Sequence, residues 1–475
     1  MKLNIMYKLT TKITLIVLGL FLITNCDGLL DTQPSDAVDP EIAQENIEGI
    51  EAILTSVYNR LQSEWRFGRE VTLGPDVLAD NTDQHPVTSG RYDGMAVNSQ
   101  GSHITFWNTA YSTINEANFV ISGSQEVEDV PQATRDRLRG EGLFQRGHAY
   151  FDLARTYGYE PNREVNGHTE SAILRTEPTQ DLSDADLRAR ASNTEIYNQV
   201  IADLEEAADL LSADDRGVFF ANYPAANALL ARAHLYLENW QDAIDYADIA
   251  LDATDAELLD SEADFIENPF DQSPPNAESI YELNIDPVEE SLGSNVGLCP
   301  YTNPRHWHDV TPSQNLLDIF DENDYRNHLF GVAEDDSNPS PFNTYTRKWN
   351  CSTGNVDDNV PLIRVAELYL IKAEAHAELN QITQALDNLE TLQTARGLDP
   401  FVSADQAEII DEIMVERRRE LNFEGHRFFD LKRRAMDIPK QQGATTVPYD
   451  DFRILSELPT SEVDNNPNLN QNPGY

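Results

Sequence analysis

The chain has 475 residues, which is enough for one large domain or two to three ordinary domains with an ample core. It carries 82 Asp and Glu residues against 34 Lys and Arg residues, and the resulting net charge of −48 makes nucleic acid and anionic lipid poor partners. We interpret this acidity as an adaptation to high salt, which shortens the range of charge repulsion.

The first 25 residues have the pattern of an export signal. Lys2, Lys8 and Lys12 precede an apolar run at 13–23, which is too short to span a bilayer comfortably. Cys26 follows in a setting that resembles the bacterial lipobox, so we expect cleavage before it, lipidation on it and a flexible tether over 26–40. An ordinary signal peptide with an incidental cysteine is the alternative. No later segment is long and apolar enough to cross a membrane.

Helical periodicity dominates the first half of the remaining chain. Apolar residues recur at helical spacing from Glu41 to Gln62, and Ser192 begins a capping pattern with Glu195. The elements expected in chain order are a helix at 41–62, a loop-rich stretch at 67–102, helices at 104–122 and 133–157, an irregular span at 158–190, and a helix from 192 to about 211.

Tyr223–Ala253 is the clearest internal unit. Small residues on one face predict two antiparallel helices that approach closely, as in tetratricopeptide repeats. A second unit follows 142 residues later, where Ala373 corresponds to Ala231 and Ala385 to Ala243. We expect helical repeat units at about 133–253 and 360–400 to form a scaffold. Packing between helices is the preferred interpretation of the Ala-rich faces, and a peptide-binding groove is the alternative.

The segment 258–359 lacks regular periodicity and contains short strand candidates at 279–283 and 345–349. A long irregular insertion in a helical protein usually carries function. We therefore predict ligand contacts where this lobe meets the other irregular lobe, 67–102. The fold class is mainly α, with helix pairs supporting a large lobe of loops and short strands.

Glu416–Arg433 interleaves four acids with seven Arg, Lys and His side chains, against the acidic background of the chain. The periodicity predicts a helix to Asn422, a stop near Gly425 and a second short helix. Glu416 and Glu420 share a helix face, so Arg417 and Arg418 are expected to bridge them. A structural ion-pair clamp is the preferred interpretation, and a phosphate or sugar-acid site is the alternative.

This last segment resembles the C-terminal signature of the SusD/RagB family of nutrient-uptake lipoproteins. Four further motifs in the family's order support the resemblance: Trp107 with Tyr111, Ile114 and Asn118; Arg146 with Ala149, Tyr150, Phe151, Leu153 and Gly158; Arg364–Ala375; and Asn466–Tyr475. The resemblance implies one SusD-like domain over 41–475, attached to the outer membrane and facing outward. It also implies a role as the lid of a SusC-like TonB-dependent transporter, with an oligosaccharide, or a peptide in the RagB-like branch, as ligand.

Sugar sites combine flat aromatic rings with planar polar groups. Tyr301, His306 and Trp307 supply both in the second lobe, with a loop anchor as the alternative for Trp307. The matching polar set in the first lobe is Asn81, Asp83, His85, Arg91 and Tyr92, with turn formation as the alternative. Trp107, Trp240 and Trp349 are expected to pack in the interior.

Catalytic and cofactor patterns are not apparent in the sequence. Cys299 and Cys351 are able to form one disulfide, and two separate buried thiols are the alternative. We expect no metal, because neither cysteine has a CxxC or CxxH partner, and no cofactor, because phosphate-binding glycine motifs are missing. We expect no enzymatic activity. A carboxylate-dependent glycan hydrolase or lyase and a helical scaffold for other proteins are the alternatives.

Overall fold

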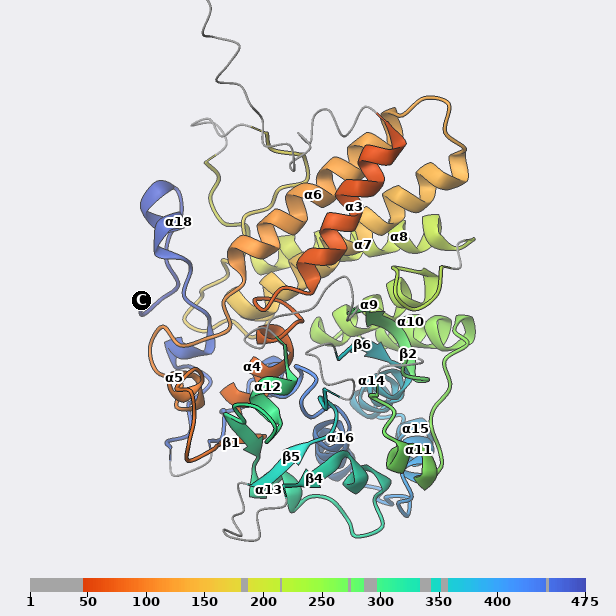
Figure 1. Ribbon diagram of the computed structural model, residues 1–475, viewed down its shortest axis with the longest axis vertical. Coiled ribbons are helices and arrows are strands. Elements are labelled where there is room, and N and C mark those ends of the chain that lie inside the picture. The colour runs from red at the N-terminus through yellow and green to blue at the C-terminus, as the bar shows by residue number, and fades with distance from the viewer. Residues whose placement is uncertain are drawn as a thin grey trace, which may run out of the picture.

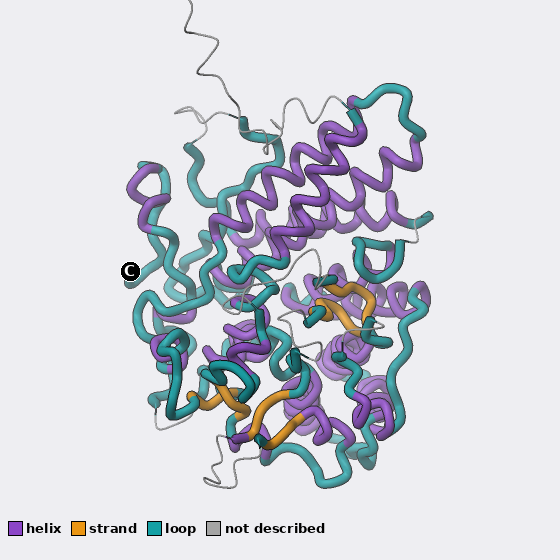
Figure 2. Tube along the Cα trace, viewed as in Figure 1, coloured by secondary structure: helices purple, strands orange, loops and turns teal. Residues whose placement is uncertain are grey.

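The computed structural model describes residues 46–180, 187–213, 216–271, 275–285, 297–333, 343–351, 358–440 and 444–475. The predicted signal peptide, the lipidation site Cys26 and the tether at 26–40 lie outside this range. The chain is mainly helical with a few short strands, as predicted (Figures 1 and 2). None of the helices in the described ranges has both the length and the apolar character needed to cross a bilayer.

The longer helices carry the frame of the molecule. They are α3 (Ile47–Leu61), α6 (Trp107–Glu126), α7 (Gln132–Tyr157), α8 (Asn193–Leu211), α9 (Tyr223–Tyr236), α10 (Trp240–Ala253), α14 (Val365–Glu378), α15 (Ile382–Ala395) and α16 (Gln406–Glu420). The shorter ones are α4 (Glu70–Leu78), α5 (Asp93–Ala96), α11 (Glu262–Glu267), α12 (Cys299–Thr302), α13 (Gln314–Leu317), η2 (Tyr325–Leu329), α17 (Arg427–Arg433), η4 (Phe452–Ile454) and α18 (Thr460–Asn465).

Within the described ranges, six short strands pair into three antiparallel ribbons. The strands are β1 (Thr82–Gln84), β2 (Ser279–Leu283), β3 (Val310–Pro312), β4 (Phe330–Val332), β5 (Thr344–Thr346) and β6 (Val360–Arg364), and they pair as β1–β3, β2–β6 and β4–β5. The strand predicted at 279–283 is confirmed, whereas the one predicted at 345–349 ends at Thr346. Five of the six strands belong to the predicted irregular lobe at 258–359, or border it.

The helices predicted in the first half are confirmed. Figure 1 shows α3, α6 and α7 side by side, with α8 packed against α7. Ser192 and Glu195 form the expected capping box, which satisfies the first amide groups of α8. Phe106, Phe144, Tyr150 and Phe151 are buried in the large core that these helices share with the repeat units.

The two repeat units have the same geometry at an offset of 142 residues. α9 begins at residue 223 and α14 at residue 365, each has 14 residues, and α10 and α15 start at residues 240 and 382. Glu238 and Asn380, also 142 apart, both turn the chain with a positive φ, of 58° and 57°. Ala231, Ala243, Ala373 and Ala385 are fully buried, as close helix packing requires.

The prediction that 67–102 is loop-rich is wrong in part. Residues 70–78 form helix α4, and all nine are buried although Gly74 and Pro75 lie in the helix. Gly74 faces Ile104 so closely that an added Cβ would lie 2.9 Å from Cγ1 of that side chain. Tertiary packing therefore favours a helix here despite two residues that ordinarily interrupt one.

Glu416–Arg433 forms the two helices expected, α16 and α17, although α16 ends at Glu420 rather than Asn422. Gly425 adopts φ +84° and lies against the backbone of α4, where an added Cβ would be 2.5 Å from the Val71 oxygen. Only glycine fits both constraints.

The ion-pair clamp is confirmed, but with other partners than expected. Glu416 and Glu420 are bridged by Arg326 of η2, whose Nη1 lies 2.6 Å and 3.0 Å from them. Arg417 instead binds Asp430, and Arg418 binds Asp80. The expected bridging by Arg417 and Arg418 is wrong because neighbouring residues on a helix point in different directions.

Candidate ligand-binding site

The two irregular lobes meet at the β1–β3 ribbon, as predicted. Thr82 pairs with Pro312 and Gln84 with Val310, and the His85 amide extends the ladder by donating to the Asp309 carbonyl at 2.9 Å. The Asp309 carboxylate accepts from the Ser89 amide at 2.7 Å and from its hydroxyl. Residues more than 200 positions apart in the chain are thus held in one surface.

Tyr301, in the short helix α12, is the centre of this junction. Its ring is fully buried and lies edge-on to Tyr92, with 5.6 Å between the ring centroids. The guanidinium groups of Arg69 and Arg91 lie 5.1 Å and 5.2 Å from the same ring. Arg69 is also ion-paired with Glu64 and Glu70, which holds its guanidinium group against the Tyr301 ring.

Trp307 is presented above this cluster. Its indole is 42% exposed, and its ring centroid lies 5.9 Å from that of Tyr301. The loop is folded back on α12 because the amides of Trp307 and His308 both donate to the Pro300 carbonyl, at 2.9 Å and 3.0 Å. A half-exposed indole on a fixed loop has the geometry of a stacking platform for an apolar ring face.

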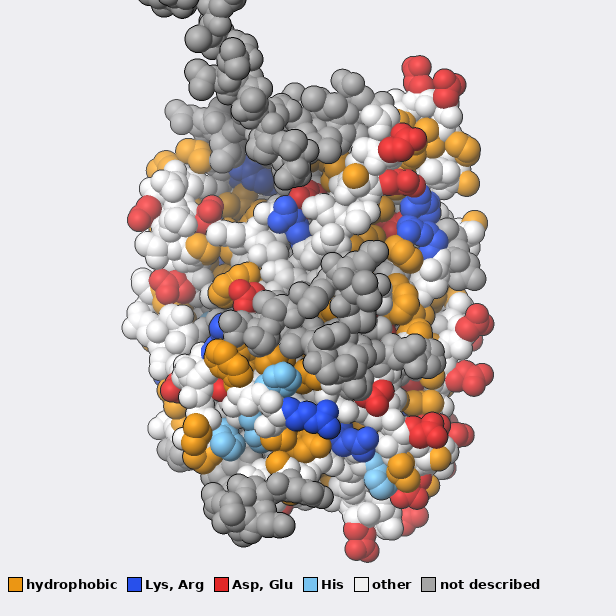
Figure 3. Space-filling view, in the orientation of Figure 1, with side chains coloured by type: hydrophobic (Ala, Val, Ile, Leu, Met, Phe, Trp, Pro, Cys, Tyr) orange, Lys and Arg blue, Asp and Glu red, His pale blue; other side chains and the backbone are white. Residues whose placement is uncertain are grey.

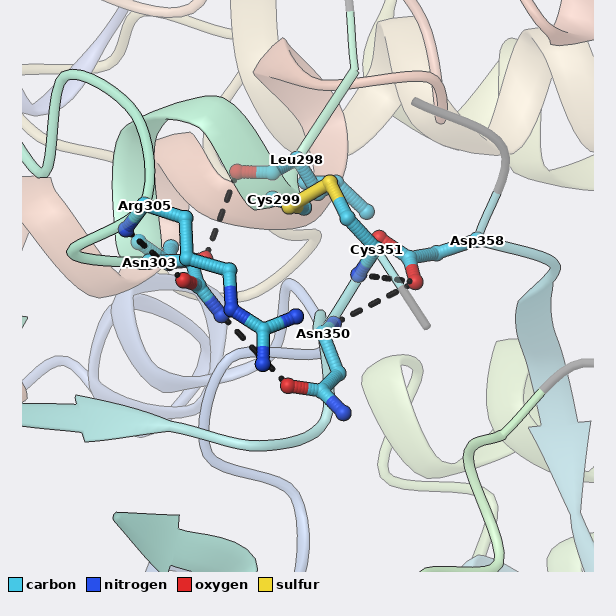
Figure 4. The surroundings of a disulfide bond; sticks show 8 residues. Leu298, Cys299, Asn303, Arg305, Asn350, Cys351 and Asp358 are labelled. Atoms are coloured by element: carbon cyan, nitrogen blue, oxygen red, sulfur yellow. Dashed lines mark hydrogen bonds between the residues drawn. A yellow bond between two sulfur atoms is a disulfide. The ribbon is translucent and has the colours of Figure 1, made fainter. Parts of the chain in front are cut away.

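A disulfide fastens the base of this loop. Cys299, at the start of α12, is bonded to Cys351 (Figure 4). The amides of Asn350 and Cys351 both donate to one carboxylate oxygen of Asp358, at 3.2 Å and 2.9 Å. The sulfur atoms lie near His306, but a disulfide leaves no thiolate to bind a metal.

The predicted site residues do not all reach the same surface. Tyr301, Trp307, Arg91 and Tyr92 form one contiguous cluster, although Tyr92 is 1% exposed and contributes from beneath. Asn81 is fully buried, donating to Asp76 at 2.6 Å and accepting from Arg418 at 2.8 Å. It is therefore engaged in packing α4 against α16. Asp83 lines a separate small cavity of about 200 Å³ with Ala96 and Val97.

Comparison with known proteins identifies the scaffold. Residues 321–475 match the model of the SusD family, and residues 30–237 match a model described as starch-binding and associating with the outer membrane. The chain belongs to the SusD/RagB family.

Relatives of this SusD/RagB protein extend over its whole length. SusD-like protein P2 of Formosa agariphila is 26% identical and the alignment covers 98% of this chain and 99% of the relative. SusD-like protein P38 of the same organism is 24% identical, with 97% and 98% covered.

Solved structures agree on the fold. A SusD superfamily protein from Bacteroides thetaiotaomicron superimposes with a TM-score of 0.80 at 24% identity, covering 92% of this chain and all of that one. A SusD-like carbohydrate binding protein from Bacteroides vulgatus gives a TM-score of 0.78 at 23% identity, covering 90% and 97%.

The SusD/RagB protein carries one residue at the site, Arg69, that its sequence did not single out. Arg69 lies in the turn before α4 and stacks beneath Tyr301, but an arginine in a turn gives no sign of its partner 232 residues away. His85 and His308, one from each lobe, contact each other with 5.0 Å between ring centroids and a tilt of 30° between the ring planes. Burial, with a smaller contribution from His85, lowers the pKa of His308 to about 4, so this ring is neutral at ordinary pH.

The surface over α12, β1 and β5 differs from the rest of the visible face. Figure 3 shows hydrophobic, His and Lys/Arg side chains side by side there, whereas Asp and Glu gather along the edge over α10 and α11. Aromatic, imidazole and guanidinium groups offer stacking faces and hydrogen-bond donors without repelling a neutral, hydroxyl-rich ligand. The SusD/RagB scaffold thus presents hydrophobic, imidazole and cationic side chains together at the lobe junction.

Proposed function

We propose that this protein is a non-catalytic, lipid-anchored binding protein that captures an oligosaccharide outside the cell and delivers it to a SusC-like TonB-dependent transporter as its lid. The observation that carries the proposal is the half-exposed Trp307 beside the buried Tyr301 ring, which the buried Arg69 and the exposed Arg91 both contact. A rigid indole beside donor groups binds a pyranose ring by stacking and hydrogen bonding, with no bond made or broken.

The family supports the cellular part of the proposal. One matching family model is described as associating with the outer membrane, and a structural neighbour is named as a carbohydrate binding protein. Cys26 is the residue proposed to carry the lipid anchor. A peptide ligand in the same lid role is the second candidate, favoured by the donor-rich rim that Arg91 and the loop histidines supply.

Ligand binding is tested by affinity electrophoresis against a panel of polysaccharides and by calorimetry with peptide mixtures. We expect retardation by at least one polysaccharide, strongly weakened in Trp307→Ala and largely retained in Trp307→Phe. Val402→Ala is the matched control, because Val402 is 82% exposed in the connection between α15 and α16. Equal retardation of the wild type and Trp307→Ala would contradict the site.

The lid role is tested by solubilising outer membranes and recovering the tagged full-length protein. We expect a large β-barrel transporter to co-purify with the wild type, and Cys26→Ser to remove the protein from the membrane fraction. New reducing ends released from a polysaccharide by the pure protein would contradict the non-catalytic assignment.

A further inference from the structure

A second exposed tryptophan lies outside the site described above. Trp65 is 43% exposed, which is close to the value for Trp307. By contrast, Trp107 is 3% exposed and Trp349 is fully buried. A single exposed apolar side chain needs no explanation, but an exposed indole that lines a cleft with other aromatic residues does. The position of Trp65 is therefore informative.

Trp65 forms one side of a cleft of about 400 Å³ at the start of α6. Phe106 and Trp107 line it as well, and both are held firmly: Phe106 packs against the guanidinium of Arg66 at 4.9 Å, and Trp107 lies 5.0 Å from the Tyr157 ring. The two buried rings thus form a fixed floor for the cleft, beside the exposed indole of Trp65.

The remainder of the cleft is polar and hydroxyl-rich. Thr105, Asn108 and Thr460 are exposed at its rim, and Glu457 adds an acceptor; the other lining residues are Gly101, Thr109, Leu458 and Pro459. The first turn of α6 also presents backbone amides that have no partner within the helix. An aromatic wall facing amide, hydroxyl and carboxylate groups matches the alternating apolar faces and hydroxyl edges of a sugar.

The cleft and the Trp307 platform are joined through one short segment. Trp65 and Arg69 are four residues apart, so their Cα atoms are at most about 15 Å apart. Arg69 in turn stacks beneath Tyr301, which contacts Trp307. Arg69 thus connects the segment that carries Trp65 to the cluster that carries Trp307, and both indoles are half-exposed.

We propose that the Trp65 cleft is a second carbohydrate-binding subsite, and that the protein holds an extended oligosaccharide at both Trp65 and Trp307. This proposal rests on the proposed function and adds that the ligand is a chain long enough to contact both platforms. Short oligosaccharides then occupy one platform at a time.

The test compares short and long fragments of one polysaccharide that retards the full-length protein, chosen from starch, laminarin, xylan and pectin. Di- to trisaccharides and octasaccharides are titrated by calorimetry into the wild type, Trp65→Ala, Trp65→Phe and Trp307→Ala. We expect Trp65→Ala to weaken octasaccharide binding about tenfold, with a much smaller effect on the short fragments, and Trp65→Phe to retain most of the affinity.

Ile266→Ala is the matched control, since Ile266 is an apolar residue of α11 that is 51% exposed. A second readout uses Trp307→Phe, in which a ligand-induced change in tryptophan emission reports mainly on Trp65. Unchanged octasaccharide affinity in Trp65→Ala overturns the second subsite while leaving Trp307 in place. A Trp65→Ala variant that binds glycans normally but no longer recovers the transporter would assign the cleft to the protein interface. Failure of every polysaccharide to bind contradicts the proposed function itself.

Discussion

At the scale of single residues, the interior of this protein is organised by Glu420. Its carboxylate accepts hydrogen bonds from Arg326, Arg364 and Arg396, at distances between 2.9 Å and 3.0 Å. Burial alone would raise the pKa of Glu420, but the three guanidinium groups outweigh burial and hold it well below its ordinary value. One carboxylate thus compensates part of the charge of three buried cations.

We therefore expect Glu420→Gln to lower the free energy of unfolding by about 3–5 kcal/mol, because it leaves buried cations uncompensated. The change is measured by urea unfolding at pH 7. Glu390→Gln, on the exposed face of α15, is the control and is expected to shift the free energy by less than about 0.5 kcal/mol. Equal stability of the two variants would show that the ion pairs of Glu420 make no net contribution to the free energy of unfolding.

His148 provides a pH-dependent test at the same scale. It is buried between Phe67 and Phe144, and burial lowers its pKa to about 3 from an ordinary value of 6.5. Below pH 6.5 the unfolded chain binds a proton at His148, whereas the folded chain does not. The contribution of neutral His148 to the free energy of unfolding is therefore fully present above pH 6.5, and it falls as the pH decreases toward 3. His148→Phe should remove up to about 1.4 kcal/mol per pH unit from the slope of unfolding free energy between pH 6 and 4. Parallel slopes for the wild type and the variant would contradict the assignment.

At the scale of elements, the two repeat units show what sequence alone is able to predict. Helix bounds, the offset of 142 residues and the buried alanines follow from local periodicity, which both units display clearly. α4 was missed because Gly74 and Pro75 suppress the local signal while tertiary contacts supply the stability. Arg69 and the true partners of Glu420 were missed because long-range pairing among many arginines has no local signature.

The turns at Glu238 and Asn380, which join the two helices of each repeat unit, allow a direct test of the repeat geometry. Asn380 is exposed and adopts φ 57°, a left-handed conformation that glycine and asparagine tolerate and β-branched residues do not. Asn380→Val should destabilise the protein by about 1–2 kcal/mol, whereas Asn380→Gly should be nearly neutral. Urea midpoints of the two variants check this, and identical midpoints would argue against the left-handed turn.

The disulfide also acts at the scale of elements, because it holds α12 and therefore the loop that carries Trp307. Cys299 and Cys351 are separated by 52 residues, and closing a loop of that size stabilises by about 4 kcal/mol in the chain-entropy model. The double variant Cys299→Ser/Cys351→Ser should lose much of this stability and should also bind glycan more weakly than the wild type at a temperature where both are folded. Full glycan affinity in the double variant would show that Pro300 and the Arg69–Tyr301 stack suffice to hold the loop.

At the scale of the whole molecule, many of the cations lie in the interior, where they are paired with buried carboxylates. Arg66, Arg69, Arg326, Arg396 and Arg417 are among the largest fully buried side chains, and Lys348 and Lys432 are buried as well. The net charge is −48, so the cations that would neutralise surface acids are occupied in interior pairs. Repulsion between surface carboxylates therefore opposes folding, while the interior pairs are shielded from solvent ions.

Added salt should consequently stabilise this protein. Raising potassium chloride from about 0.1 M to 1 M shortens the Debye length from about 10 Å to about 3 Å, which screens surface repulsion but leaves the buried pairs intact. We expect the thermal midpoint to rise over this range and to change much less beyond it, because exposed ion pairs contribute little that salt is able to remove. Glycine betaine at matched osmolality is the control for effects that do not depend on screening. A thermal midpoint that falls with salt would mean that exposed ion pairs contribute more to stability than repulsion among surface acids takes away. That result would contradict the interpretation of the acidic surface as an adaptation to high salt.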